Sequence, residues 1–337
     1  MGTIVLLILI LGLSAAGSAI YFPFASKYGP YATPNYRSLH RQVIPRGAGL
    51  ALAVASLLGY GFLYCKDLLN GAQAWVYLVG GFVVLGMGVA DDRLDIRARY
   101  RMPFQILTAI WTLHWLGVSP RLEFGFGAID LGTVGWLVLL AALVWFYNLY
   151  NFIDGIDGMA ASAAIFLCAS MGTVLSFDQQ HALSVILMVL GAASTGFLFF
   201  NWPPARMFLG ESGSSFMSLV FGAVCVESIC ANPGLLWTWL IAGSFYFCDT
   251  TLTTLVRVLK VPGWYRPHRS HAYQNLARVW NDHRKVVLRV LMINLFWVTP
   301  LLLLSLKYEA WAIGVTVLVY IPLAVFCLKY GPLYANK

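Results

Sequence analysis

The chain has 337 residues, of which 60% are hydrophobic and only 11% are charged, and its mean hydropathy is +0.74. Because soluble proteins carry roughly a quarter charged residues, this composition excludes an ordinary soluble enzyme and predicts an integral membrane protein. The net charge of +8 is interpreted as the lysine and arginine excess of cytoplasmic loops, so no nucleic-acid partner is expected.

The long apolar runs predict an all-α, polytopic membrane protein that forms one domain over residues 1–337. A bilayer core of about 30 Å needs about 20 apolar residues per helix, and only helices or closed barrels can cross it. About eleven spans are expected, at roughly 4–24, 48–64, 74–90, 103–118, 134–152, 159–176, 182–200, 213–230, 235–256, 286–306 and 310–328. The first span is expected to be retained, because it lacks the preceding basic residue of a signal peptide.

The distribution of basic residues predicts the orientation of these spans. One set of connections carries 19 lysine and arginine residues, whereas the other set carries only Lys66, Arg121 and Lys307. The richer set is assigned to the cytoplasm, which places the N-terminus outside and the C-terminus inside. Among the outer connections, residues 119–133 alternate apolar residues with glycine, a pattern compatible with a small hairpin.

Polar residues of catalytic type gather on the predicted cytoplasmic side, in loops near 33–49, 91–101, 148–158, 201–214 and 257–285. One composite cytoplasmic site explains why the carboxylates lie where the basic residues are already concentrated. The first of these loops combines proline and glycine with arginine, serine and histidine, which suit phosphate. A solvated interfacial loop fits that composition equally well.

The third expected span ends in the acidic sequence Asp91-Asp92-Arg-Leu-Asp95. If this turn is helical, Asp95 lies one turn from Asp91 and Asp92. Such a carboxylate cluster suits Mg²⁺ held partly through water and phosphate, and it also offers a general base. The alternative is a helix end paired with neighbouring arginines, namely Arg93, Arg97 and Arg99.

A polar pattern with a period of three follows the fifth expected span. Asn148, Asn151, Asp154 and Asp157 recur at every third position, just before Gly158. Residues three apart on a helix are neighbours on its surface, and carboxylates this close repel each other unless a cation or a donor-rich ligand lies between them. The pattern predicts a binding site for a metal or a phosphorylated ligand, because a plain helix cap needs only one such residue.

Two further segments complete the candidate site. In 201–214, glycines flank Glu211 just before an expected helix start, where a carboxylate can hold a metal while backbone N–H groups meet phosphate; a plain turn is the alternative. The longest cytoplasmic loop carries His268, Arg269 and His271, which suit a pyrophosphate but are too few for a zinc site.

Asp249 is an ionisable residue within the ninth expected span. If the span is helical throughout, this carboxylate lies about 12 Å deeper than Arg257. An ionisable residue inside a span is a functional candidate by default. A buried partner for Arg257 or Thr253 is an equally good interpretation.

Three of these motifs together resemble the polyprenyl-phosphate N-acetylhexosamine-1-phosphate transferases, the superfamily of phospho-MurNAc-pentapeptide translocase, also called glycosyltransferase family 4. The motifs are Asp-Asp-x-x-Asp at Asp91, Asn-x-x-Asn-x-x-Asp-Gly-x-Asp-Gly at Asn148, and Asn-x-x-Pro-Ala-x-x-Phe-x-Gly-acid-x-Gly-Ser at Asn201. The resemblance covers about residues 34–274. The segment His-Arg-Ser-His-Ala-Tyr-Gln at His268 is most similar to the members that initiate O-antigen synthesis.

The resemblance implies a magnesium-dependent phosphoglycosyl transferase of the bacterial inner membrane, with its active site facing the cytoplasm. A UDP-N-acetylhexosamine would give its sugar-1-phosphate to undecaprenyl phosphate, and UMP would leave. This step initiates O-antigen, and thus lipopolysaccharide, or another envelope glycan. Mn²⁺ is expected to substitute for Mg²⁺, the bilayer supplies the lipid substrate, and a homodimer is one assembly left open.

The resemblance also implies roles for individual residues. The expected catalytic residues are Asp91, Asp92 and Asp154. The expected metal ligands are Glu211, Asp92 and Asp154, although Glu211 stands where relatives carry aspartate. The residues expected to bind the nucleotide or sugar are Asn148, Asn151, Asp157, Gly158, Asn201, Phe208, His268, Arg269 and His271, with Phe208 stacking on uracil.

Two other functions share some of these sequence features. A membrane prenyltransferase of the UbiA type also uses aspartate clusters with Mg²⁺, but the glycine-rich stretches around 154–158 and 210–214 argue against it. A proton-coupled transporter predicts ionisable residues deep in several spans. The expected spans contain only Asp249, His114 and Glu227 as deep candidates.

Overall fold

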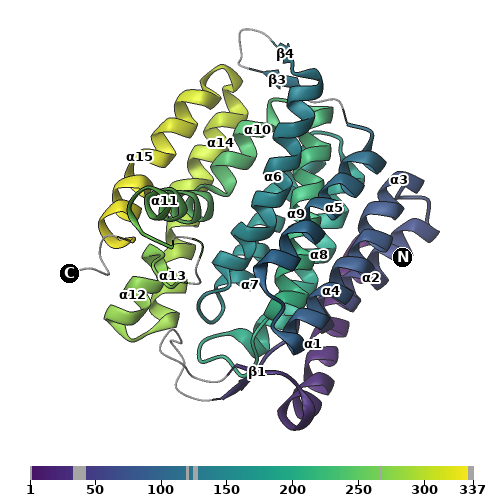
Figure 1. Cartoon of the computed structure of the whole chain (residues 1–337). Helices are drawn as coiled ribbons and strands as arrows, with labels where there is room; N and C mark the ends of the chain where they lie inside the picture. Colours follow the sequence, from purple (N-terminus) through teal and green to yellow (C-terminus); the bar gives the residue numbers. More distant parts are fainter. Residues whose placement is uncertain are drawn as a thin grey trace.

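The computed structural model describes residues 2–32, 43–118, 121–123, 128–263, 265 and 268–332 (Figure 1). Its α-helices are α1 Thr3–Tyr28, α2 Gly49–Cys65, α3 Gly71–Ala74, α4 Gly81–Leu94, α5 Ala98–Leu116, α6 Gly132–Ile153, α7 Met159–Phe177, α8 His181–Asn201, α9 Gly210–Ala231, α10 Leu235–Ala242, α11 Ser244–Lys260, α12 Ala272–Trp280, α13 His283–Ile293, α14 Thr299–Lys307 and α15 Ala312–Tyr330. Two π-helical turns, Trp75–Gly80 and Asn294–Val298, join α3 to α4 and α13 to α14. The all-α, polytopic membrane fold is thereby confirmed.

Eight helical segments are long and apolar enough to cross a bilayer, and α2 is a shorter apolar helix. The eight include α3–α4 as one segment, Gly71–Leu94, and α13–α14 as another, His283–Lys307. Together with α5, these segments match ten of the eleven expected spans within a few residues. The number eleven and the orientation in the membrane stay predictions.

The ninth expected span, 235–256, is wrong as a single helix. The chain breaks at Gly243, which ends α10 and begins α11 with a φ of −87° and a ψ of 4°. In Figure 1, α11 is seen almost along its axis while the neighbouring helices run across the view. Asp249 and Arg257 both lie within α11, so about 12 Å of helix still separates them. Because α11 does not run parallel to its neighbours, this length is not a depth in the membrane.

The two ends of the helix bundle carry small hairpins. β3 (Arg121–Glu123) pairs with β4 (Ala128–Asp130) between α5 and α6, which confirms the expected hairpin, whereas its position outside the membrane stays a prediction. β1 (Tyr31–Ala32) pairs with β2 (Ile44–Pro45). Figure 1 places these hairpins at opposite ends of the molecule, with β1 beside the lower end of α1.

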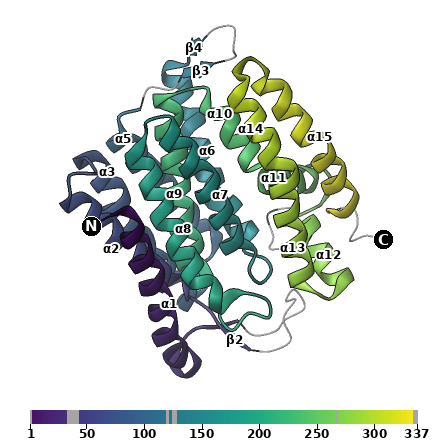
Figure 2. The ribbon, with the colours of Figure 1, turned by 180° about the vertical axis from the view of Figure 1, so that it is seen from behind.

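The core of the bundle is built around α7, α8 and α9. Small side chains on α7, including Ala160, Ala161 and Ala164, are fully buried, and such residues let helix backbones approach closely in a membrane. Figure 2 shows α1 packed along α8 on the opposite face of the bundle from α14 and α15. A Cβ at Gly196 would lie 2.4 Å from the carbonyl oxygen of Leu11, so this close approach requires glycine.

The orientation is testable at two exposed alanines at opposite ends of the bundle. Ala98 begins α5 on the predicted cytoplasmic side, and Ala310 lies in the turn between α14 and α15 on the other side. In a Cys65→Ser background, which removes an exposed thiol, a membrane-impermeant maleimide should label Ala310→Cys in intact cells. It should label Ala98→Cys only after the membrane is opened. The opposite pattern would invert the orientation.

Candidate active site

Asp92, near the end of α4, holds the start of α9. Its two carboxylate oxygens accept backbone N–H bonds of 2.9 Å from Glu211 and 3.1 Å from Ser212. The side chain is only 4% exposed. Gly210 allows this contact, because its φ is +75° and a Cβ there would lie 2.5 Å from Asp92 Oδ1. Asp92 thus acts first as a cap that joins α4 to α9.

Asp91 and Glu211 meet through one guanidinium group. Asp91 Oδ1 accepts the backbone N–H of Ile96 at 2.6 Å, and its Oδ2 lies 3.0 Å from Nη1 of Arg101 in α5. The same Nη1 donates to Glu211 Oε1, which also accepts from the side-chain amide of Asn151. Four helices, α4, α5, α6 and α9, therefore converge on one charged cluster. A cavity of about 20 Å³ lies among these side chains.

Glu211 lies inside a helix rather than before one. The sequence placed the helix start at Gly213, but α9 begins at Gly210, so Glu211 lies in its first turn. A carboxylate at this position is stabilised by the partial positive charge of the helix N-terminus. Its Oε2 has contacts of 3.4 Å with the hydroxyls of Ser214 and Ser215, which are long for hydrogen bonds between oxygens.

Asp154 ends α6 beside this cluster, and its environment disfavours the charged form. Burial raises the pKa of its carboxyl well above the usual value, and the nearby charges of Glu211, Asp92 and Asp157 raise the pKa further. The backbone N–H of Gly210 opposes these effects. Because neighbouring negative charges disfavour the ionised form of a carboxyl group, an added cation would stabilise that form.

The period of three at 148–157 is only partly helical. α6 ends at Ile153, so Asn148, Asn151 and Asp154 follow one side of the helix and Asp157 lies beyond it. The expectation that Asp157 continues the helical pattern is therefore wrong. The side-chain N–H groups of Asn148 donate to the side-chain oxygen of Gln105 at 3.2 Å and to the carbonyl of Val144 in the same helix at 2.8 Å.

Asp157, Gly158 and Asn201 join two loops. Asp157 accepts the backbone N–H of Ala205 at 3.0 Å and lies 3.1 Å from Nδ1 of His283. The N–H of Gly158 donates to Asn201 Oδ1 at 3.0 Å, and Asn201 Nδ2 donates to the carbonyl of residue 207 at 2.9 Å. These contacts fix the loop after α6 against the loop after α8, and nucleotide binding by the three residues stays a prediction.

Phe208 lies beside the segment that leads into α2. Its backbone N–H donates to the carbonyl of Pro45 at 2.9 Å, and its own carbonyl accepts from the backbone N–H of Ala48 at 3.1 Å. The second half of the loop 33–49 thereby reaches the site, whereas residues 33–42 lie outside the described residues. Stacking of Phe208 on a base stays a prediction.

The arginines that pair with the acidic motif differ from those expected. Asp95 adopts left-handed backbone geometry, with a φ of +46°, and its side chain is 84% exposed. It pairs with Arg46 at 2.6 Å instead of facing Asp91. Arg46 also donates to the backbone carbonyl of Asp92. Clustering of Asp95 with Asp91 and Asp92 is therefore wrong, because the helix ends one residue earlier at Leu94.

His268 and His271 are adjacent, with ring centroids 5.1 Å apart, and both rings pack near Phe152 at the end of α6. Burial is the main cause that lowers the pKa of His268, to about 3, and the neighbouring His271 and Arg257 side chains act in the same direction. His268 is thus neutral at pH 7 and can offer a hydrogen bond, while the positive charge of this loop comes from its arginines.

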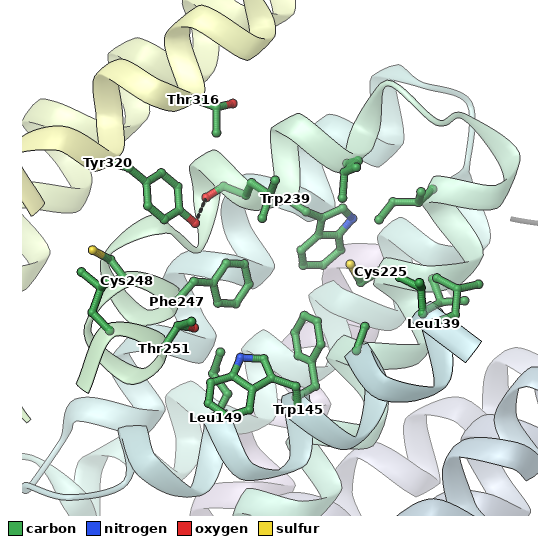
Figure 3. Close-up of a pocket in the computed structure, with 18 of the residues that line it drawn as sticks. Leu139, Trp145, Leu149, Cys225, Trp239, Phe247, Cys248, Thr251, Thr316 and Tyr320 are labelled. Atoms are coloured by element: carbon green, nitrogen blue, oxygen red, sulfur yellow. Dashed lines mark hydrogen bonds between the residues drawn. The ribbon is translucent and has the colours of Figure 1, made fainter. Parts of the chain in front are cut away.

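A large apolar groove of about 790 Å³ runs between α6, α9, α10, α11 and α15 (Figure 3). On α6 its lining extends from Leu131 to Leu149, which is roughly 27 Å of helix at 1.5 Å per residue. Trp145 and Phe247 line it, and the hydroxyl of Tyr320 is bonded to the carbonyl of Leu240 at 3.1 Å. On α6, the last residue that lines the groove is Leu149, which directly follows Asn148.

Comparison with known proteins gives a family for this arrangement. The model of "Glycosyl transferase family 4" matches residues 74–229. A decaprenyl-phosphate N-acetylglucosaminephosphotransferase of Mycobacterium tuberculosis (strain CDC 1551 / Oshkosh) is 30% identical over 78% of this chain and 73% of its own. The chain belongs to the polyprenyl-phosphate N-acetylhexosamine-1-phosphate transferase superfamily. 

Two further relatives of this family 4 member have names that describe the same kind of transferase. A probable undecaprenyl-phosphate N-acetylglucosaminyl 1-phosphate transferase of Bacillus subtilis (strain 168) is 27% identical over 83% of this chain and 79% of its own. An undecaprenyl-phosphate alpha-N-acetylglucosaminyl 1-phosphate transferase of Escherichia coli (strain K12) is 25% identical over 75% and 71%.

The sequence places Arg46 and Arg101 in the candidate loops 33–49 and 91–101 but does not single them out as site residues. Arg101 lies ten residues after Asp91, beyond the reach of a helical pairing rule, and it meets Asp91 and Glu211 only because the chain turns between α4 and α5. Within the described part of the chain, no group of three or more histidine, cysteine or acidic side chains is close enough to hold a metal as it stands.

Proposed function

We propose that this family 4 member transfers N-acetylglucosamine-1-phosphate from UDP-N-acetylglucosamine to undecaprenyl phosphate and releases UMP. N-acetylglucosamine is the sugar in the names of the three relatives. The observation that supports the proposal best is the position of α6. One side of this helix lines the apolar groove, and its end carries Asn151 and Asp154. A polyprenyl chain lying in the groove would bring its phosphate to the charged cluster.

In the proposed reaction an oxygen of the lipid phosphate attacks the phosphorus that bears the sugar, and the bond from that phosphorus to the oxygen of UMP breaks. Such a transfer depends mainly on positioning and charge neutralisation. Arg101, held by Asp91 and Glu211, is placed to neutralise phosphate charge. Asp92 contributes by fixing the start of α9, where Glu211 lies.

The side chains suit Mg²⁺, which prefers oxygen ligands and often keeps several waters. Glu211, Asp154 and the amide oxygen of Asn151 are the oxygen donors that we assign to it, with Mn²⁺ as a substitute. The proposal of a cation is supported by the environment of Asp154, where burial and then the charges of Glu211, Asp92 and Asp157 raise the pKa of the carboxyl. When bound, the metal would neutralise the diphosphate and stabilise the developing charge. The same residues orient the donor without changing their own covalent state.

The test is a donor panel with purified protein, undecaprenyl phosphate and UDP-sugars labelled in the phosphate that bears the sugar. The label should enter the lipid fraction fastest from UDP-N-acetylglucosamine, with one UMP released for each lipid labelled. A membrane prenyltransferase would leave the label in water. Absence of labelled lipid with every UDP-N-acetylhexosamine would overturn the proposal.

We infer a place for this reaction at the cytoplasmic face of a bacterial inner membrane, as the step that starts an envelope glycan such as O-antigen. UDP-sugars are cytoplasmic metabolites, and the 19 basic residues of the predicted cytoplasmic connections support that side. A polymerising glycosyltransferase must then consume the lipid-linked sugar, because its sugar hydroxyls are still free.

A further inference from the structure

Asp249 in α11 is a buried carboxylate that the proposed reaction does not use. Its side chain is 1% exposed, and Oδ1 accepts a hydrogen bond of 2.8 Å from the backbone N–H of Ala272, the first residue of α12. Oδ2 lies 3.4 Å from Nδ1 of His271, whose side chain is also 1% exposed. Neither of these two atoms makes a hydrogen bond among the described residues, so the contact between them is a close approach of two buried, unpartnered polar atoms. The carboxylate therefore faces the start of a helix and an imidazole at once.

The imidazole of His271 lies beside the end of α6. Its ring centroid is 5.4 Å from that of Phe152 and 5.9 Å from that of Tyr273, whose hydroxyl donates to the carbonyl of Phe152. Phe152 is two residues from Asp154. The second ring nitrogen of His271, Nε2, is buried without a hydrogen-bond partner in the described part of the chain. A buried polar atom in this condition calls for a partner, and a bound ligand can supply one.

We propose that Asp249 is a positioning residue that holds His271 as the tautomer with its hydrogen on Nδ1. In that tautomer Nε2 is a hydrogen-bond acceptor. The donor sugar carries hydroxyl and acetamido N–H groups, which are the donors such an atom accepts from. A carboxylate behind a functional histidine commonly fixes its tautomer and ring orientation in this way. The inference rests on the proposed function for the identity of the ligand, but the pairing itself does not.

Asp249→Asn separates this role from simple structural support. An asparagine can keep its carbonyl oxygen toward Ala272, and its NH₂ group then faces Nδ1 of His271. The amide forces Nδ1 to accept, so the hydrogen moves to Nε2. Asp249→Ala loses both contacts. A residue that only anchors α12 would therefore tolerate asparagine and suffer from alanine.

We expect Asp249→Asn to lower kcat/KM for the UDP-sugar about 10- to 100-fold, the range for losing a carboxylate behind a functional histidine. KM for the UDP-sugar should rise while KM for undecaprenyl phosphate stays within about twofold. Loss of folded protein alone would lower Vmax and leave both KM values unchanged. Adding Asp249→Asn to His271→Gln should change little further, because the two residues act as one unit.

Glu227→Gln is the matched control. Glu227 is another carboxylate within a helix of the bundle, and it accepts hydrogen bonds from Gln73 at 2.8 Å and Tyr77 at 3.0 Å. This change removes the same charge far from His271 and should leave KM for the UDP-sugar unchanged. A near-normal Asp249→Asn enzyme, or additive effects of the two substitutions at 249 and 271, would contradict the proposal.

A spectroscopic measurement tests the pair without any turnover. The chain has six histidines, so ¹⁵N-histidine labelling with His271→Gln as the assignment variant resolves the ring of residue 271. The wild-type protein should carry its hydrogen on Nδ1, and Asp249→Asn should move it to Nε2. A wild-type hydrogen on Nε2 would overturn the pairing. If no UDP-sugar is a substrate, the proposed function fails while this result still decides the role of Asp249.

Discussion

Replacing Glu211 by glutamine is expected to lower turnover by at least ~10²-fold, as is typical when a preorganised charged group is lost from an active site. The carboxylate accepts from Arg101 and Asn151, so the substitution leaves a partly buried guanidinium with Asp91 as its remaining ion-pair partner. It also removes one of the oxygen donors that we assign to Mg²⁺. The measurement is the rate of lipid labelling against Mg²⁺ concentration for the wild type and the variant.

Glu211→Asp refines this test, because aspartate is the residue that the family resemblance leads us to expect here. The shorter side chain withdraws the carboxylate from Arg101 on α5 and Asn151 on α6, so we expect lower activity and a higher half-saturating Mg²⁺ concentration. Asp95→Asn is the control, since this carboxylate is 84% exposed and surface ion pairs contribute little. A glutamine variant with full turnover and an unchanged Mg²⁺ requirement would show that Glu211 is not a ligand.

The sequence was sufficient to bring the acidic motifs to one place. Asp91, Asp154 and Glu211 each end or begin an apolar run, so each must lie at a membrane surface. The asymmetry of basic residues then assigned all three to the same surface. That reasoning needs no tertiary contact, which is why the cluster in α4, α6 and α9 could be predicted.

The internal geometry of the cluster could not be predicted, because it depends on packing between distant segments. The bond from Glu211 N–H to Asp92 joins residues 119 positions apart, and the pairing of Arg101 with Glu211 joins residues 110 positions apart. No local pattern distinguishes a capping aspartate from a ligand. The break at Gly243 is of the same kind, since many transmembrane helices tolerate glycine.

Replacing Asp154 by asparagine is expected to abolish most activity and to stabilise the metal-free protein at alkaline pH. Burial and the charges of Glu211, Asp92 and Asp157 raise the folded-state pKa of this carboxyl above its unfolded value. The folded state therefore binds the extra proton more tightly, and the resulting stability is complete below the unfolded pKa. As the pH rises through the folded pKa, that stability is lost. The side chain of asparagine does not titrate, so the variant does not lose this stability as the pH rises.

The measurement is Tm in detergent from pH 5 to pH 9 with a chelator, and again with Mg²⁺. In the chelator, the Tm of the wild type should fall more steeply as the pH rises than the Tm of Asp154→Asn. Mg²⁺ should raise the Tm of the wild type most at high pH, where the carboxylate is charged, because a ligand of the native state stabilises by mass action. Asp95→Asn should follow the wild type in both series. Equal pH slopes and equal Mg²⁺ effects in wild type and Asp154→Asn would remove this carboxylate from the cation site, and its activity loss would then need another cause.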